Sequence, residues 1–505
     1  MNPLSLEKVN TGEDKKEERL VRRLTAAYLF SVLVFLPLAV NDGYYDITET
    51  KTIVFVLLSI LYLVGRVICV LQFWERGGEP VFPKDAAIFF CAGFCLITLL
   101  SSLASGFFRN SFIGPAGRYQ GTGMMLFYAG IFFAFRGVRI SHKQILLPLS
   151  VGLGASAVLT VLNHLGLDPL RMMVSLSDHD RGRYISTLGN INFAGAYFSL
   201  TIPVAAWFLL REERWGVRVI LGIVYVLGLW GAMAVRSESA LLGLGAALLF
   251  MPFTLRREEK ALSRWGLLLT GTAAAMQGYA LLTRCSGGWL SSLTSVAARP
   301  LPSAAAAAAG IGWFLLSCRT KKKNVLLRAY GGLLAVLFVL GASGILLLNT
   351  LWREVPLGAA EQWLRFSDAW GTDRVMVWRH CLGFFADFPL PDKLIGGGCG
   401  ILALLDGANR IFPDAVLDAA HCEYLQILLN WGWLGLLTYL GWIVSAAVKA
   451  FGKGEPLSMA LLAGLTGYAV QAGVNIAQAP GITLFFVLLS SLDLSSRPDE
   501  VEEDD

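Results

Sequence analysis

The chain has 505 residues, of which 55% are hydrophobic and only 16% are charged, and its formal net charge is +5. Soluble proteins usually carry about 25% charged residues, so this composition excludes an ordinary soluble domain. Its apolar stretches are continuous rather than alternating, which excludes a β-barrel. The basic residues lie between these stretches, where they orient membrane segments, so the charge does not indicate nucleic-acid binding.

The first 23 residues are polar and end in a basic cluster of Arg19, Arg22 and Arg23. This pattern predicts a cytoplasmic N-terminal tail, residues 1–23, before a first membrane span at Leu24–Val40. A signal peptide has the same layout, but the residues after this span offer no small-x-small cleavage site. We therefore expect an uncleaved first helix.

Hydrophobic length predicts thirteen further spans, and so an all-α polytopic membrane protein with about fourteen transmembrane helices. Two of the stretches, Gly123–Phe135 and Gly481–Leu492, are short, so counts of twelve or thirteen stay open. The pattern divides the chain into spans 1 to 11 at 24–348, a large loop at 349–423, spans 12 to 14 at 424–492, and an acidic tail at 493–505. The other predicted spans are Thr52–Phe73, Ala86–Ala104, Ile145–Leu165, Asn192–Leu210, Val219–Val235, Ala240–Leu255, Trp265–Thr283, Ala304–Cys318, Val325–Leu348, Tyr424–Val448 and Leu457–Gly473.

The distribution of Lys and Arg predicts the orientation of these spans. An even number of spans places both termini on one side, and the loops on that side hold more Lys and Arg than the opposite loops. Cytoplasmic loops carry this excess. We therefore expect both termini inside and the large loop outside the cytoplasmic membrane.

The loops expected outside carry arginine, tyrosine and amide side chains. Arg118 precedes the fourth span, Arg183 and Asn190 precede the sixth, and Arg236 lies in the turn after the seventh. Such residues often anchor helix ends at the membrane surface. Because these segments all face the side of the large loop, a shared polar site is the alternative we favour.

The large loop adds Arg374, Arg379, His421 and Tyr424 to this set of candidates. An arginine-rich site suits the anionic diphosphate of a lipid-linked sugar, since the guanidinium fork fits phosphate oxygens. A histidine can orient or deprotonate an acceptor hydroxyl. His421 stands at a helix start, where Asp418 could cap the helix, and the alternative is that His421 only packs or caps there.

The remaining polar residues give weaker signals. Glu238 lies near Arg236, where a local ion pair would explain both, and His164 lies at the outer end of a span, where a structural role suffices. Four cysteines are expected outside, and their spacing leaves any disulfide pairing open. We find no spacing typical of a metal site or a nucleotide-binding loop. The residues therefore predict neither a metal nor a cofactor. The four cysteines are Cys285, Cys381, Cys399 and Cys422.

Several motifs together resemble a known family. The sequence from Ala420 to Gln426, followed by Gly432 to Leu436, is similar to the signature of O-antigen ligases, O-antigen polymerases and bacterial O-oligosaccharyltransferases. Further elements similar to the family are Gly371 to Arg379, Asp387 to Leu390, Ile395 to Gly398 and Ser186 to Gly195.

This resemblance implies a fold like that of integral-membrane GT-C glycosyltransferases, and an enzyme that works without metal or nucleotide sugar. It implies essential roles for Arg374 and His421. From the residues themselves we add candidate diphosphate or glycan contacts, which are Arg118, Arg183, Arg236, Arg379, Asn190 and Tyr424. Where the family has a second essential arginine, this chain has Glu238, and the sequence leaves open whether Arg236 replaces it.

The expected function is transfer or polymerisation of an oligosaccharide from a polyprenyl diphosphate carrier onto a glycan, lipid or protein acceptor at the outer face of the cytoplasmic membrane. The alternative from another class is a lipid-linked glycan flippase or polysaccharide exporter without chemistry. A transporter should carry charges or broken helices near the membrane midplane. The sequence does not distinguish ligase from polymerase or identify the sugar.

Overall fold

The computed structural model describes residues 12–76, 85–178, 180–408, 410–413 and 415–496. Within these residues, nine helices are long and apolar enough to cross a membrane, so the protein is a multi-pass helical membrane protein. Most of the expected acidic tail, at 497–505, and the first eleven residues of the expected N-terminal tail lie outside the described residues.

Each of the fourteen stretches predicted as spans falls on a helix of the structure. Among the described residues, six further α-helices and two 3-10 helices lie between them in regions that the sequence left as loops. A π-helix, η1 at Ser31–Phe35, joins α1 to α2. The helices that carry the predicted spans are α1 (Gly12–Phe30), α2 (Leu36–Leu38), α3 (Ile47–Glu75), α4 (Ala86–Ala104), α6 (Thr122–Ala134), α7 (Lys143–His164), α8 (Ile191–Arg211), α9 (Trp215–Ala234), α10 (Glu238–Thr254), α11 (Glu259–Cys285), α13 (Pro300–Arg319), α14 (Lys323–Asn349), α19 (Glu423–Lys453), α20 (Pro456–Ala472) and α21 (Gly481–Ser490).

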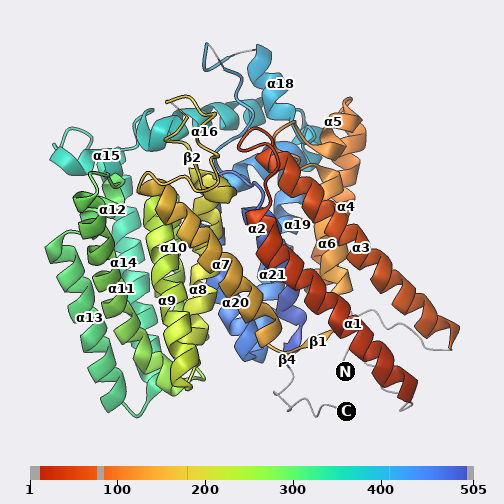
Figure 1. The fold of residues 1–505 in the computed structure, drawn as a ribbon. Coiled ribbons are helices and arrows are strands. Elements are labelled where there is room, and N and C mark those ends of the chain that lie inside the picture. Colours follow the sequence, from red (N-terminus) through yellow and green to blue (C-terminus); the bar gives the residue numbers. More distant parts are fainter. Residues whose placement is uncertain (1–11, 77–84, 179, 409, 414, 497–505) are drawn as a thin grey trace.

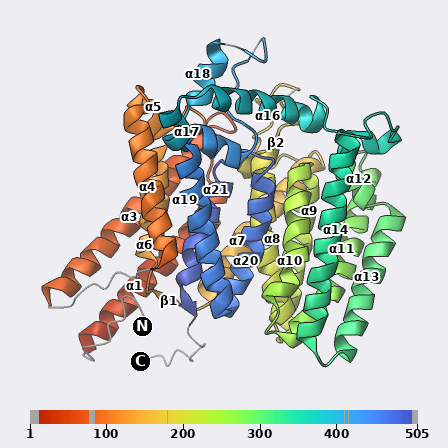
Figure 2. The same cartoon turned by 180° about the vertical axis from the view of Figure 1, so that it is seen from behind.

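The shorter elements gather mostly at one end of the helix bundle, which we call the loop end. There α16 lies across the tops of the long helices, with α15 and α18 beside it (Figure 1 and Figure 2). The segment expected to be a large loop is thus largely helical. These elements are α5 (Phe108–Ile113), β2 (Tyr184–Ile185), η2 (Ser186–Leu188), β3 (Gly189–Asn190), α12 (Ser292–Ala297), η3 (Gly358–Ala360), α15 (Glu361–Leu364), α16 (Trp370–Asp387), α17 (Leu390–Ile395) and α18 (Ile401–Ala408).

The first and last described residues of the chain, 12 and 496, lie at the opposite end of the bundle. There β1 (Arg139–Ile140) pairs in parallel with β4 (Ser495–Ser496), which follows η4 (Ser491–Asp493), and α1 contacts β1. Figure 1 shows this end away from α16. Placement of both described ends at one end of the bundle agrees with an even number of crossings.

A network of charged side chains ties this end together. Asp85, before α4, accepts from Arg136 at 2.8 Å and from Lys449 of α19 at 2.6 Å. Asp493 contacts both Arg136 and Lys449 in turn. Because Arg136 is buried, this pairing avoids leaving its charge without partners, and it holds the residues around Asp493 against the bundle.

The core of the bundle forms around α8, which is buried along most of its length and contacts α7, α9, α10, α20 and α21. Glycines allow α8, α10 and α20 to approach closely. A Cβ at Gly464 would lie 2.2 Å from the Leu200 oxygen, and one at Gly467 would lie 2.3 Å from the Ser199 oxygen. Small residues allow membrane helices to pack backbone to backbone, which replaces the hydrophobic driving force absent in lipid.

The alanine run of α13, Ala304–Ala309, does not form a close helix–helix contact, although its small side chains favour one. Most of these alanines are exposed, and α13 instead approaches α11 through Gly310, whose Cβ would lie 2.3 Å from the Gly266 oxygen. The alanine side chains therefore face away from the bundle.

Candidate active site

Arg374 lies near the start of α16, after a sharp change in chain direction. Gly371, Thr372 and Asp373 all have positive φ, between 63° and 65°, which breaks the helix just before Arg374. The Arg374 guanidinium donates to the Gly371 oxygen, while its Nε is buried without a hydrogen-bond partner. A positive φ costs energy for Thr372 and Asp373, so surrounding contacts must hold both residues in this conformation. The same contacts fix the position of Arg374, which follows them directly.

Arg374 interacts electrostatically with two residues from distant parts of the chain. Burial lowers the pKa of Arg374, and the carboxylate of Glu238, the first residue of α10, raises it. Arg374 in turn lowers the pKa of His421, which precedes α19. The fold therefore gathers Arg374, Glu238 and His421 at the loop end.

His421 is partly buried and has a φ of +51°, an unusual conformation for histidine. Burial, the charge of Arg374 and the charge of Arg118 together lower the pKa of His421 to about 4, and Asp418 acts in the opposite direction. The imidazole is therefore neutral at pH 7 and able to accept a proton. Its pKa lies below the ordinary histidine value that the sequence suggested.

Arg118 completes this group through a two-pronged ion pair. Its Nε and Nη2 donate to the two carboxylate oxygens of Asp418 at 2.9 and 2.8 Å. Asp418 therefore pairs with Arg118 and does not cap α19, whose N-cap is Cys422 with no side-chain hydrogen bond. The pairing joins the loop before α6 to the loop that carries His421.

Arg236 has partners other than the one the sequence suggested. Its φ is +60°, its guanidinium lies 4.3 Å from the ring centroid of Trp289, and its Nη2 donates to the Gly182 oxygen at 3.3 Å. Burial lowers the pKa of Arg236. Glu238 instead acts on the charge of Arg374, so the expected local pair between Arg236 and Glu238 is replaced by contacts across the fold.

The other predicted site residues have different surroundings. The Arg183 side chain is largely exposed and lies 4.0 Å from Asp180. Arg379, farther along α16, is exposed and pairs with Asp368 at 2.7 Å, beside a surface groove. Arg183 and Arg379 therefore each pair with a nearby carboxylate, and no hydrogen bond or ion pair joins either of them to Arg374, His421 or Arg118 in the described part of the chain.

Asn190 and Tyr424 have structural partners. The Asn190 side chain accepts from the Asn192 backbone nitrogen at 2.9 Å and so caps α8. The Tyr424 hydroxyl donates to the Ala469 oxygen at 2.6 Å and joins α19 to α20. These two hydrogen bonds are sufficient reason for an asparagine at 190 and a tyrosine at 424, and neither requires a ligand.

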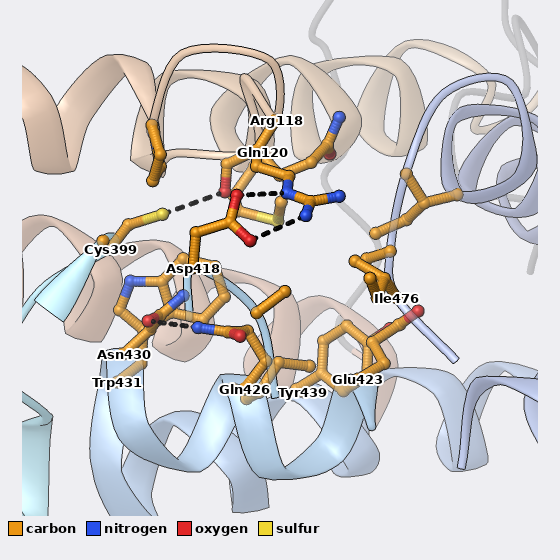
Figure 3. Close-up of a pocket in the computed structure, with 17 residues that line it drawn as sticks. Arg118, Gln120, Cys399, Asp418, Glu423, Gln426, Asn430, Trp431, Tyr439 and Ile476 are labelled. Carbon is orange, nitrogen blue, oxygen red and sulfur yellow. Dashed lines mark hydrogen bonds and ion pairs between the residues drawn. The ribbon is translucent and has the colours of Figure 1, made fainter. Parts of the chain in front are cut away.

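A pocket lies beside the Arg118–Asp418 pair, and the sequence analysis missed most of its polar residues (Figure 3). The empty space within the pocket and in the open solvent at its mouth amounts to about 580 Å³. Glu423, Gln426 and Asn430 of α19 line it, at spacings of three and four residues that place them on one helix face. That spacing was the signal that could have found them.

Two of these side chains are held by hydrogen bonds. Glu423 is fully buried and accepts from the hydroxyls of Tyr439 and, at 2.9 Å, Tyr468. Gln426 accepts from the Ala420 backbone nitrogen at 2.8 Å and donates to Asn430 at 3.0 Å. Gln426 therefore fixes the loop just before His421 to the first turns of α19.

The glycine-rich run before α18 contacts α19 where that helix is broken. Gly432 has φ +66° and ψ −168°, which frees carbonyl groups of the preceding turn. The backbone nitrogens of Gly397 and Gly398 donate to the oxygens of Leu429 and Asn430 at 3.1 and 3.0 Å. This contact places the α17–α18 segment against the wall of the pocket.

We expect Gly396→Ala to destabilise the folded protein by more than about 2 kcal/mol. The φ of Gly396 is +79°, and a Cβ there would lie 2.2 Å from the Asn430 oxygen, where the backbone cannot move away. Thermal unfolding in detergent measures the effect. Gly383→Ala in α16, where a Cβ meets nothing within 4 Å, is the matched control, and equal melting temperatures for the two variants would contradict the prediction.

Backbone strain concentrates at this end of the molecule. Among the described residues other than glycine, seven have positive φ, and these include Arg236 and His421 themselves as well as the neighbours of Arg118 and Arg374. Such conformations persist only where the surroundings enforce them, and they are common at functional sites. The seven residues are Tyr119, Arg171, Ser186, Arg236, Thr372, Asp373 and His421.

Within the part of the chain that the structure describes, no three His, Cys, Asp or Glu side chains group closely enough to hold a metal ion. The chain matches no protein-family model, and a search of curated proteins finds no relative.

Proposed function

We propose that this protein is a membrane glycosyltransferase of the O-antigen ligase type. It moves or polymerises an oligosaccharide from a polyprenyl diphosphate carrier onto an acceptor at the outer face of the cytoplasmic membrane. The observation that carries the proposal is the convergence of Arg374, His421 and Arg118 from three separate segments, beside a pocket. The resemblance of the motifs around Arg374 and His421 to that family supports it.

In this proposal the arginines stabilise the leaving group. The acceptor oxygen forms a bond to the anomeric carbon of the donor sugar, and the bond from that carbon to the diphosphate oxygen breaks. The departing diphosphate gains negative charge, which the partly buried guanidinium of Arg374 offsets. His421, neutral at pH 7, accepts the proton that the acceptor hydroxyl loses.

The alternative class, a flippase or exporter, finds some support in two features. Lys51 of α3 is buried and donates to the oxygens of Leu36, Pro37 and Ala39, each at 2.9 Å, and α19 is broken at Gly432. However, Lys51 lies only about one turn from the start of α3. The break at Gly432 packs against the α17 segment of the loop end, because a Cβ at Gly432 would lie 2.4 Å from the Leu394 oxygen. Both positions favour a site at the loop end over a path through the membrane.

An assay in liposomes separates the two classes. Purified protein is reconstituted with a polyprenyl diphosphate oligosaccharide and an acceptor glycan. We expect free carrier diphosphate to be released in proportion to product formed. Movement of intact carrier between leaflets without release would support the flippase and overturn the enzyme.

We further propose that all fourteen predicted spans cross the membrane, with both termini in the cytoplasm. Single cysteines introduced at Glu361 and Lys322, both exposed in the structure, test this. In a background without exposed native cysteines, a membrane-impermeant maleimide added outside should label position 361 and leave position 322 unlabelled. Labelling of 322 alone would place the candidate site on the cytoplasmic face and overturn the proposal.

We expect turnover to be independent of divalent cations. The proposal assigns the diphosphate charge to Arg374 and its neighbours, and at least one carboxylate of the same segment, Asp368, already pairs with Arg379. Carrier release should therefore continue after treatment with EDTA. Loss of activity in chelator, restored by Mg²⁺ or Mn²⁺, would show that a carboxylate binds a metal and that the arginine account is wrong.

A further inference from the structure

The ion pair between Arg118 and Asp418 lies within reach of a ligand. Figure 3 shows both side chains at the wall of the pocket, with both oxygens of Asp418 turned toward the Arg118 guanidinium. The Arg118 side chain is 23% exposed and that of Asp418 is 40% exposed, so neither is sealed from solvent. Partly exposed ion pairs contribute little to stability, so a stronger partner can replace either member.

Backbone hydrogen bonds hold the chain on both sides of Asp418. The Leu417 nitrogen donates to the Asp406 carboxylate at 2.7 Å. The Ala420 nitrogen donates to the Gln426 side chain at 2.8 Å. Neither bond involves the side chain of Asp418. This side chain can therefore exchange partners by rotation about its own bonds, while the loop stays in place.

The Asp418 carboxylate occupies an edge of Arg118 that also suits a phosphate. Carboxylates and phosphates both present two oxygens to the planar guanidinium fork, here to Nε and Nη2. A diphosphate carries more negative charge than a carboxylate, so it is the stronger partner. If it approached Arg118 while Asp418 stayed in place, like charges would lie side by side, which is unfavourable. Entry of a diphosphate therefore favours rotation of Asp418 away from Arg118.

Asp418 has a second partner within the range of its charge. His421 follows it by three residues, and the charged groups that act on the imidazole are Arg374, Arg118 and Asp418. The two arginines lower the pKa of His421, and Asp418 raises it. While Arg118 holds the carboxylate, the positive charge of Arg118 offsets that effect. Release from Arg118 leaves Asp418 free to stabilise the imidazolium that forms when His421 accepts a proton.

We propose that Asp418 exchanges partners during the reaction. It holds Arg118 in the ligand-free protein, gives up the guanidinium to an entering diphosphate, and then supports the protonated form of His421. Binding of the donor thereby prepares the base, so the acceptor is activated only beside a bound donor. The identity of the anion as the carrier diphosphate rests on the proposed function, whereas the exchange itself requires only a diphosphate.

Binding of a carrier-like diphosphate tests the exchange without turnover. The full chain is placed in nanodiscs made from lipids without polyprenyl carriers, and farnesyl diphosphate is titrated by calorimetry against empty nanodiscs as the blank. Asp418→Asn keeps the shape of the side chain but removes the competing charge, so the Kd should fall about fivefold, the value of one partly exposed ion pair. If Asp418 only positions Arg118, the variant should instead raise the Kd. An unchanged or raised Kd would overturn the exchange.

Further variants make the binding test specific. Arg118→Ala should weaken binding, and in this background Asp418→Asn should tighten it less, because no guanidinium is left to release. Asp368→Asn breaks another pair of an aspartate with an arginine, Arg379, and should leave the Kd unchanged. Melting temperatures show whether each variant folds. Asp418→Ser also removes the carboxylate and gives the same test if Asp418→Asn is unstable.

The second half of the exchange is measured at His421. In protein with isotope-labelled histidine, NMR gives the pKa of this imidazole, and its signal is assigned by its loss in His421→Gln. Saturating farnesyl diphosphate should raise the pKa of His421. The rise should be smaller in Asp418→Asn, because only the diphosphate then offsets the arginines. Equal rises in the parent and the variant would show that Asp418 does not support His421, and the exchange would be wrong.

The outcomes are distinct from those of the proposed function. In an active enzyme, Asp418→Asn should lower both the KM for the donor and kcat, whereas loss of a residue that only positions Arg118 would raise that KM. If the variant changes diphosphate binding and the pKa of His421 as expected but the parent releases no carrier, the glycosyltransferase proposal fails and the exchange stands. If carrier release is normal but the variant binds diphosphate no better than the parent, the exchange is wrong and the proposed function stands.

Discussion

Replacing Arg374 by alanine is expected to lower the rate of carrier release by a few hundredfold or more. Loss of one preorganised group that stabilises developing negative charge typically costs about 3 to 4 kcal/mol in the transition state. Arg374→Lys should be nearly as poor, because a point charge cannot make the paired contacts of the planar guanidinium. Single-turnover assays with saturating donor measure the chemical step directly.

Two further variants distinguish a loss of catalysis at Arg374 from a loss of stability. Arg374→Ala leaves the nearby Glu238 carboxylate without its charge partner, so the variant could lose stability as well as activity. The double variant Arg374→Ala, Glu238→Gln should recover the melting temperature but not the rate. Arg353→Ala removes an exposed arginine of the same segment and should retain activity. Activity of Arg374→Lys close to the parent would remove the guanidinium from the mechanism.

His421→Gln is expected to lose roughly 10² to 10⁴ in rate, the usual contribution of a general base. Glutamine keeps a similar length and can still form hydrogen bonds, but it cannot take up a proton at neutral pH. Folding should change little. The matched control is His380→Gln, which replaces a partly exposed histidine of α16 away from Arg374 and should stay active.

The pH dependence of the parent enzyme tests the same role. Only neutral His421 can accept a proton, so activity should rise with pH through the pKa of this residue. In the free protein burial and the two arginines lower that pKa to about 4, so kcat/KM should rise near pH 4 and be flat from about pH 6 to 8. A bound diphosphate offsets the charges of Arg374 and Arg118, so the corresponding rise in kcat should occur at higher pH.

These measurements separate proton transfer from simple packing. If His421→Gln remains active and the acid limb of its profile matches that of the parent, His421 only packs or positions the loop, and the arginines carry the reaction. A rise in kcat/KM near the ordinary histidine pKa of about 6.5 would show that the site is more hydrated than the burial of His421 indicates.

The sequence by itself determined where the long apolar helices lie, nine of which, among the described residues, are long and apolar enough to cross a membrane. A stretch of apolar residues long enough to span lipid must form a helix, because only a helix satisfies its backbone hydrogen bonds within one segment. All fourteen predicted stretches therefore fall on helices, including the short ones at Gly123–Phe135 and Gly481–Leu492. Apolar length says less about residues 349–423, where the short helices α15 to α18 form from mixed polar and apolar residues.

Part of the candidate site was also readable from residue types. Arg374, His421 and Arg118 were chosen because arginine and histidine suit a diphosphate reaction, and the fold brings them together. Asn190, Tyr424 and Arg379 belong to the same residue classes, yet their partners are a helix cap, a backbone carbonyl and a surface carboxylate. Residue type therefore did not separate ligand contacts from structural ones.

Only the tertiary structure decided which side chains share one space. Glu238 is two residues from Arg236 in the chain, but its charge acts on Arg374, more than a hundred residues later. The pocket likewise joins Gln120, Glu423 and Trp431 from segments that no local pattern connects. Periodicity and residue class report the neighbours of a residue along its own helix, whereas a site depends on helix packing, which sets the contacts between segments far apart in the chain.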